Sequence, residues 1–322
     1  MNGFIPDFSW SAHVIVPWRD LAATNIWIVL MGFLVAAACG LVGNFLILRR
    51  MALVGDAISH SVLPGMVVAF LLVGSRSTTA MFVGALAAGW LTTVMIESIH
   101  KSSRVKQDAA IGIAFTSLFA IGVILVSLYA SKIDLDQECV LYGEIAFVPL
   151  QPVVELFGVH LGPTPVFRMA VLTLLTASLV VLFYKELLVS SFDPGLAASL
   201  GMNATLIHYL LMGWLSLIVV GAFESVGAIL VIGMLILPGA TASMITQRLP
   251  VRLGLSVVHA ALSSLIGFHL GTWLNCSIAS GMVVAATGLF LIAWVFGPVD
   301  GLLHRFRRPA VEAEVETSAK PV

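Results

Sequence analysis

The sequence predicts an all-α fold, a polytopic membrane helix bundle of eight or nine transmembrane helices. Of the 322 residues, 59% are hydrophobic and only 10% are charged, whereas soluble domains contain about 45–50% apolar and about 25% charged residues. The mean hydropathy is +1.05, and apolar stretches of the roughly 20 residues that a spanning helix needs recur along the chain. The net charge of −1 comes without an acidic or basic block, so nothing indicates a nucleic-acid partner.

Nine stretches are apolar and long enough to cross a bilayer. We expect spanning helices at 25–48, 51–74, 78–97, 109–131, 166–188, 206–222, 225–246, 253–271 and 278–297. Glu224 interrupts the stretch at 206–246, which could form two short helices or a re-entrant element, so eight or nine spans are expected. The chain then divides into an external N-terminal segment, a transmembrane domain and a short cytoplasmic tail, at 1–24, 25–300 and 301–322. The N-terminus lacks a basic start followed by an apolar core, so no cleavable signal is expected.

Basic residues favour one set of helix ends, which predicts the orientation of the bundle. One set carries Arg49, Arg50, Lys101, Arg104, Lys106, Lys185, Arg248, Arg252, Arg305, Arg307, Arg308 and Lys320. The other set carries only Arg19, Arg76, Lys132 and Arg168. Because basic residues concentrate on the cytoplasmic side, the N-terminus should lie outside the cell and the C-terminus in the cytoplasm.

The predicted external loop at 132–165 carries several acidic residues. They could raise the local cation concentration or simply form a solvated surface. Cys139 in this loop and Cys276 would lie on the same side of the membrane, which would allow a disulfide. The third cysteine, Cys39, lies in an apolar helix, and no CxxC pair occurs to indicate a zinc cluster.

Asp56 and His60 place an acid and an imidazole four residues apart within a predicted span. Residues at this spacing share one face of a helix. A charged side chain deep in a bilayer costs about 2.5–3.5 kcal/mol on insertion scales, so such groups usually line a polar path or a site. Carboxylate oxygen and imidazole nitrogen together suit manganese, iron and zinc ions. The pair therefore predicts a station on a cation path.

The depth of this pair supports the interpretation. At 1.5 Å per residue from the cytoplasmic Arg49 and Arg50, Asp56 lies about 9 Å and His60 about 15 Å into a hydrocarbon core about 30 Å thick. Two ligands suit a transient station that must release its ion, and two copies facing each other across a dimer axis would supply four. The alternative is that Asp56 pairs with Arg49 or Arg50 at the surface and that His60 only packs.

The segment at 193–203 is predicted to form a two-turn helix on the cytoplasmic side, between two spans. Asp193 suits the N-cap, Pro194 the first helical position and Gly201 the C-terminal cap. Its leucine and alanine side chains would present a small apolar face that fits a groove on a partner. An ordinary connecting turn is the alternative.

Other polar residues within the apolar stretches are weaker candidates for a metal path. Glu224 lies near the outer surface in the nine-span arrangement, where it is either simply exposed or part of an outer gate. His208, His259 and His269 are isolated, and such histidines are more often hydrogen-bonded packing residues than ligands. His269, near the outer end of its span, is the strongest of the three as a metal ligand.

No motif supports an enzymatic activity. The chain lacks a Gly-x-x-x-x-Gly-Lys-Ser/Thr loop, so it is not expected to bind and hydrolyse ATP by itself in that way. His-Glu-x-x-His and Gly-x-Ser-x-Gly are also absent.

Five stretches between about 40 and 245 together resemble a known family. They are RRMALVGDAISH at 49–60, KQDAAIGI at 106–113, LYGEI at 141–145, FDP with SLG at 192–194 and 199–201, and FESVG at 223–227 continuing to Pro238. In this order they resemble the membrane permease subunit of bacterial ABC importers for manganese, zinc or iron.

The resemblance implies a mechanism. Two permease chains, identical or paralogous, would form the path across the bacterial inner membrane, and cytoplasmic ATP-binding subunits would hydrolyse ATP. An external metal-binding protein would deliver the ion, and no permanently bound cofactor is implied. Asp56 and His60 match the family's metal-contacting pair. The residues that match the helix coupled to the ATPase are Asp193, Pro194, Leu196, Ser199, Leu200 and Gly201.

The resemblance also ranks the metals. The loop DLD at 134–136 with CVLYGEI at 139–145 looks most like the manganese and iron members, so manganese is favoured, with zinc or iron next. The short tail departs from members with a long cytoplasmic extension, which argues against a built-in metal sensor. A stand-alone secondary cation transporter or channel is the alternative, although such proteins typically show internal repeats with interrupted helices, which we do not see here.

Overall fold

The structure, a computed structural model, describes residues 6–74, 77–129, 145–156, 159–299 and 301–303, without the side chains of Thr78, Leu156, Val159 and Glu224. Within these ranges, nine segments are long and apolar enough to cross a membrane, which confirms the predicted polytopic all-α bundle. The helices that supply them are α2 (Ala22–Leu48), α3 (Val54–Val73), α4 (Thr78–Ser102), α5 (Gln107–Tyr129), α7 (Thr164–Leu182), α10 (Ala204–Ile245), α11 (Leu249–Leu274) and α12 (Ile278–Phe296).

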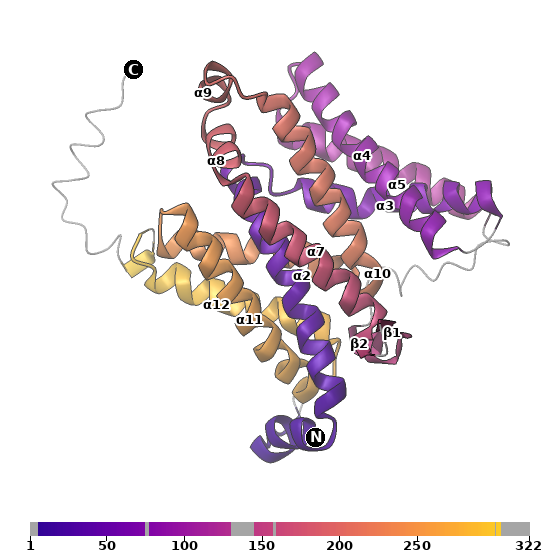
Figure 1. Cartoon of the computed structure of the whole chain (residues 1–322), viewed down its shortest axis with the longest axis vertical. Helices are drawn as coiled ribbons and strands as arrows, with labels where there is room; N and C mark the ends of the chain where they lie inside the picture. Colours follow the sequence, from indigo (N-terminus) through magenta and orange to yellow (C-terminus); the bar gives the residue numbers. More distant parts are fainter. Residues whose placement is uncertain (1–5, 75–76, 130–144, 157–158, 300, 304–322) are drawn as a thin grey trace.

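Helices α2 and α10 form the centre of the bundle (Figure 1). Helix α2 is the most buried of the described spans, and its Met31, Val35 and Phe45 have no exposed surface. Helices α7, α11 and α12 pack on this centre. Because α2 is apolar around its whole circumference, it suits a position enclosed by other helices.

Helices α3, α4 and α5 pack together as a second unit, which meets the centre mainly through α10. Gly65 on α3 and Gly84 on α4 lie so close that a Cβ atom on either would collide with the backbone of the other. Small residues at such positions let membrane helices approach closely. The unit carries the Asp56–His60 pair, whereas the segment at 193–203 belongs to the rest of the chain.

A backbone break divides α10 and resolves the open number of spans. Gly227 has φ 76° and ψ 168° inside this 42-residue helix, a conformation that glycine adopts readily because it has no Cβ. The stretch therefore holds two spans, Ala204–Phe223 and Ser225–Ile245. The sequence left open whether this stretch forms two short helices or a re-entrant element, and the structure has two helices.

The predicted fifth span at 166–188 is too long. Helix α7 ends at Leu182, Phe183 leaves the helical conformation, and a separate helix α8 (Tyr184–Phe192) follows. The charged Lys185 and Glu186 directly after the break belong at a membrane surface rather than inside a span, which accounts for the early end. Helix α9 (Pro194–Ser199) comes next.

Short elements lie at the end of the bundle opposite α9 (Figure 1). The N-terminal segment forms a π-helical turn, η1 (Ser11–Ile15), and a short helix, α1 (Val16–Asp20). A 3-10 turn, η2 (Ile145–Leu150), precedes an antiparallel hairpin of β1 (Val153–Leu156) and β2 (Val159–Pro163). Cys139 and the tail at 304–322 lie outside the described residues, so the proposed disulfide with Cys276 remains a prediction.

Candidate metal path and coupling segment

Asp56 and His60 lie side by side in the first two turns of α3. The Nε2 atom of His60 is 3.4 Å from Oδ1 of Asp56, and their side chains are 27% and 37% exposed. The i, i+4 spacing thus brings the acid and the imidazole together as predicted. Both side chains keep a route to the surface of the chain, which a station that receives and releases an ion requires.

Aromatic side chains of α5 border this pair. The ring of His60 lies 5.2 Å from that of Phe115 and 5.6 Å from that of Phe119, centroid to centroid. The polar pair therefore sits beside an apolar wall. Among the described residues, no group of three or more acidic, histidine or cysteine side chains could hold a metal ion. Within this part of the chain the pair would offer an ion only two ligands.

Arg49 does not pair with Asp56, which removes one support for the surface-pairing alternative. Its Nε and Nη2 atoms donate to the hydroxyls of Ser191 and Ser190 at 3.0 and 2.9 Å. Burial lowers the pKa of Arg49 to about 10, so the guanidinium is still protonated at neutral pH. Arg49 thereby fastens the last turn of α8 to the end of α2, immediately before α9.

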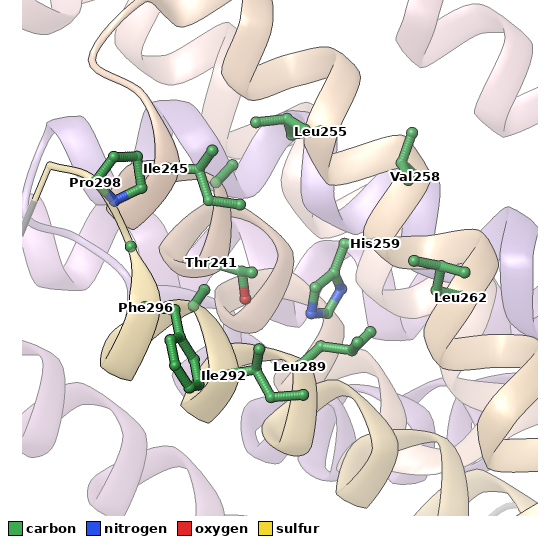
Figure 2. Close-up of a pocket in the computed structure, with 13 residues that line it drawn as sticks. Thr241, Ile245, Leu255, Val258, His259, Leu262, Leu289, Ile292, Phe296 and Pro298 are labelled. Atoms are coloured by element: carbon green, nitrogen blue, oxygen red, sulfur yellow. The ribbon is translucent and has the colours of Figure 1, made fainter. Parts of the chain in front are cut away.

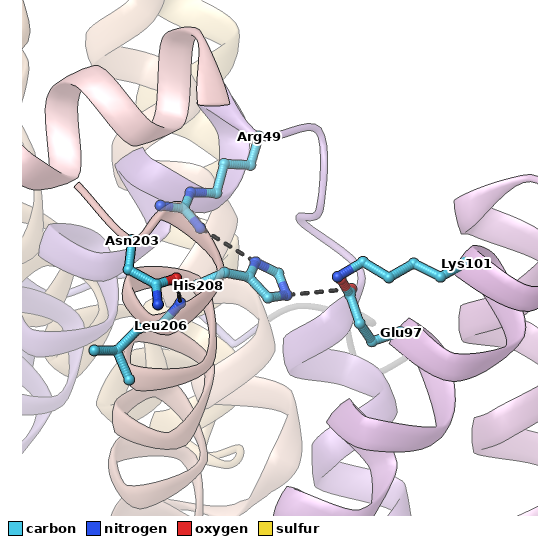
Figure 3. Close-up of polar contacts among 6 residues, drawn as sticks. All are labelled: Arg49, Glu97, Lys101, Asn203, Leu206 and His208. Carbon is cyan, nitrogen blue, oxygen red and sulfur yellow. Dashed lines mark hydrogen bonds and ion pairs between the residues drawn. The ribbon is translucent and has the colours of Figure 1, made fainter. Parts of the chain in front are cut away.

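A second acid–imidazole pair, Glu97 and His208, joins α4 to α10 (Figure 3). The Nε2 atom of His208 is 3.3 Å from Oε2 of Glu97. This is ion-pair distance, but the two groups are not aligned as a hydrogen bond. Lys101 reaches the other carboxylate oxygen at 2.6 Å, and Arg49 Nη1 lies 3.2 Å from Nδ1 of His208. Sequence reasoning missed this cluster, although the i, i+4 spacing of Glu97 and Lys101 was a local signal for part of it.

The hydrogen-bond roles in this cluster argue against a metal site. A guanidinium only donates, so Nδ1 of His208 accepts from Arg49 and Nε2 carries the proton. That proton faces the Glu97 carboxylate, which leaves no free nitrogen lone pair for a metal. Two cationic side chains also surround the pair. The cluster is therefore a structural tie between α2, α4 and α10.

The structure describes the contacts of the His269 side chain but not those of Glu224. Nε2 of His269 accepts from the indole N–H of Trp18 at 3.1 Å, and Nδ1 donates to the carbonyl of His13 at 3.0 Å. Both ring nitrogens are thus occupied, so we leave His269 out of the metal path. Glu224 lies three residues before the break at Gly227, and its side chain is outside the described part of the structure.

Helix α9 has the caps that the sequence predicts. Oδ1 of Asp193 accepts from the N–H groups of Gly195 and Leu196 at 2.9 and 3.0 Å, and Pro194 is the first helical residue. Gly201 has φ 80°, which lets the chain turn back toward α10.

One side of α9 packs against the bundle and the other is exposed. Ala197 is fully buried, whereas Leu196 and Leu200 are 50% and 59% exposed. Ser199 bonds its own helix, since its hydroxyl donates to the carbonyl of Leu196 at 2.8 Å. The two leucines therefore form a small apolar surface at the end of the bundle.

A cavity of about 340 Å³ lies between α10, α11 and α12, on the other side of α2 from the α3–α5 unit (Figures 1 and 2). Its walls are almost entirely aliphatic and aromatic. The polar side chains that line it are His259, 3.3 Å from the carbonyl of Ala286, and Thr241, which bonds Leu237. His259 therefore has the packing role expected of an isolated membrane histidine, and this cavity is not suited to a metal ion.

A multi-pass helical fold with an acid–imidazole pair on one span suits a membrane transport protein. Residues 23–297 match the ABC 3 transport family, and the chain belongs to that family. The match covers all nine described spans except the first residue of the first.

Individual relatives agree with this assignment. The chain is 49% identical over 280 residues to the manganese transport system membrane protein MntD of Bacillus subtilis, covering 87% of this chain and 94% of that protein. It is 43% identical to the zinc transport system membrane protein TroD of Treponema pallidum, covering 86% of this chain and 75% of that protein. A solved structure, PsaBC from Streptococcus pneumoniae in complex with Fab, is 34% identical with a TM-score of 0.73, covering 92% of this chain and 99% of that one.

Proposed function

We propose that this chain is the permease subunit of an ABC importer for divalent transition metal ions. The observation that carries the proposal is the Asp56–His60 pair, 3.4 Å apart on a membrane span of a chain in the ABC 3 transport family. Manganese is the leading substrate, because the relative named above with the higher identity is a manganese transport protein. Zinc follows, since TroD is named for zinc, and iron suits the same two ligand types.

Asp56 and His60 act as a transient station for the ion. Two ligands bind weakly enough to release their cargo, which conduction requires. In a dimer of permease chains, identical or paralogous, two such pairs facing each other would offer four ligands. The exposure of both side chains supports this arrangement, because ligands from a second chain could reach them. Glu224 remains a candidate for an outer gate.

Helix α9 is the proposed coupling helix. Its exposed leucines, Leu196 and Leu200, would dock in a groove of a cytoplasmic ATP-binding subunit, which would hydrolyse the ATP. Asp193, Pro194 and Gly201 hold the short helix in shape, and Ser199 closes its last turn. Arg49 fixes α8 just ahead of it.

The membrane and the orientation of the chain in it are also part of the proposal. The chain would lie in the inner membrane of a bacterial cell, with its N-terminus outside and its C-terminus in the cytoplasm. The bias of basic residues supports this orientation. An external metal-binding protein would deliver the ion to the outer face.

A stand-alone secondary cation transporter is the second candidate. The break at Gly227 favours it, because interrupted helices often form the sites of such transporters. The exposed, capped helix α9 favours the importer, since a self-sufficient transporter needs no docking helix.

Metal uptake into sealed vesicles distinguishes the two candidates. The vesicles would contain this chain, its ATPase and its delivery protein, with manganese, zinc and iron in competition, with and without ATP. We expect uptake that requires ATP and favours manganese. Uptake that ignores ATP and follows an ion gradient would overturn the importer in favour of the secondary transporter.

A further inference from the structure

The N-terminal segment at 6–20 precedes the part of the chain that matches the family. It forms the turn η1 and the helix α1, which lie across the end of the bundle beside the start of α2 and the end of α11 (Figure 1). Its position is therefore the level at which two membrane spans reach a membrane surface. Nothing in the proposed transport path uses it.

Three hydrogen bonds hold this segment to α11. The indole N–H of Trp273 donates to the carbonyl of Pro6 at 3.0 Å. His269 provides the other two, since it accepts from Trp18 and donates to the carbonyl of His13. The rings add to this attachment, because Phe8 lies 5.3 Å from Trp273, centroid to centroid. His269, an unusual polar residue within a span, is thereby explained as an attachment point.

The segment exposes several large apolar and aromatic side chains, with the polar Asp7, Ser9 and Ser11 exposed between them. Phe8, Trp10 and Ile15 are 53%, 65% and 51% exposed. Exposed apolar side chains continue along the chain into the first span, where Leu21 and Ile26 are 60% and 50% exposed. Tryptophan and other amphipathic aromatic rings concentrate where a membrane meets water, and short helices with one apolar face lie flat in that layer.

We propose that residues 6–20 form an interfacial anchor, which inserts Phe8, Trp10 and Ile15 into the headgroup layer of the adjacent lipid leaflet. The lipid surface is the favoured partner because the exposed row is continuous with the surface of a membrane span. The segment ends in the Arg19–Asp20 ion pair, whose side chains are 78% and 52% exposed. His269 holds the anchor at a fixed depth.

Spin labels on the full chain in lipid bilayers test the anchor. Labels would be attached through Trp10→Cys and Ile15→Cys, with Asp20→Cys as the control, because five residues after Ile15 is another face of the helix. Cys139 and Cys276 would be replaced by serine, whereas Cys39 stays because it is completely buried. We expect the labels at 10 and 15 to collide more with oxygen, which dissolves in lipid, than with a water-soluble nickel complex, and the label at 20 to show the reverse.

Two results would overturn the proposal. Equal access of the nickel complex to all three labels would show that the segment lies in water. Labels at 10 and 15 that become shielded only when a soluble metal-binding protein is added would show that the surface docks a protein instead.

The role of His269 has a matched control on the same helix. His269→Leu removes two of the three hydrogen bonds, so the label at 10 should become more mobile. His259→Leu replaces another histidine of α11, which bonds Ala286 and does not touch the segment, and should leave that label unchanged. Equal mobility in the two variants would refute the attachment by His269. Because no transport is measured, these outcomes are independent of the proposed function.

Discussion

Two acid–imidazole pairs occupy this membrane protein, and they differ in nearly everything except their side-chain types. Asp56 and His60 lie on one helix, 3.4 Å apart, with side chains 37% and 27% exposed. Glu97 and His208 lie on two helices, 3.3 Å apart, with side chains 12% and 15% exposed. The first pair stands beside the aromatic rings of α5, whereas two basic side chains surround the second.

The difference shows how surroundings decide what one set of ligands can do. Lys101 pairs with Glu97, and Arg49 donates to Nδ1 of His208 and so fixes the proton of that ring on the nitrogen facing the carboxylate. The second pair therefore joins helices. In the described residues, Asp56 has no lysine or arginine within ion-pair distance. Its charge is left available to a cation from outside, which is why we assign the metal station to this pair.

Asp56→Asn should have the largest effect on transport. Loss of partners that merely support a metal ligand already costs about 10–100-fold in affinity or activity, so loss of the ligand charge should reduce metal uptake on the order of a hundredfold or more. The substitution preserves shape at a half-exposed position, so assembly with the ATPase should be unchanged. Uptake in vesicles and co-purification measure the two quantities. Uptake close to that of the unmodified chain would remove Asp56 from the path.

Glu97→Gln should have the opposite effect: it should lower the stability of the fold and leave metal uptake largely intact. It removes the negative charge that pairs with Lys101 and that the N–H of His208 faces, and a hydrogen bond to a charged group is worth about 1.5–3 kcal/mol. Because Lys101 is 58% exposed and screened by water, the cost should fall in the lower part of that range. The thermal midpoint in detergent should fall by several degrees, while uptake per folded molecule stays well above that of Asp56→Asn. An unchanged midpoint would contradict a structural role for this pair.

The sequence was sufficient to predict features set by neighbouring residues. Asp56 and His60 meet because four residues make about one helical turn, and α9 begins at Pro194 because Asp193 caps it. The spanning helices were predictable because each is an apolar stretch long enough to cross a membrane. The break in α10 was placed only approximately, because the conformation of Gly227 depends on the helices around it as well as on its own residue type.

Contacts between distant segments could not be predicted in this way. His208 and His269 both looked like isolated membrane histidines, yet one pairs with α4 and the other holds the N-terminal segment. In both cases the partner comes from a helix far away in the sequence, so no local pattern identifies it. The sequence indicated that packing was the more frequent role for such residues, but it could not say which residues they contact.

The two basic side chains around Glu97 should contribute unequally, which offers the finest test of the comparison. Lys101→Met removes an exposed partner, and exposed ion pairs are worth about 0–1 kcal/mol, so the thermal midpoint should shift by a few degrees at most. Arg49→Met removes a half-buried group that bonds Ser190 and Ser191 as well as His208, so its midpoint should fall further. Parallel melting curves in one detergent measure the difference. Equal shifts would contradict the unequal contributions, whereas a larger loss for Arg49→Met would show that its hydrogen bonds to α8 and to His208 stabilise the cluster more than the exposed Lys101 does.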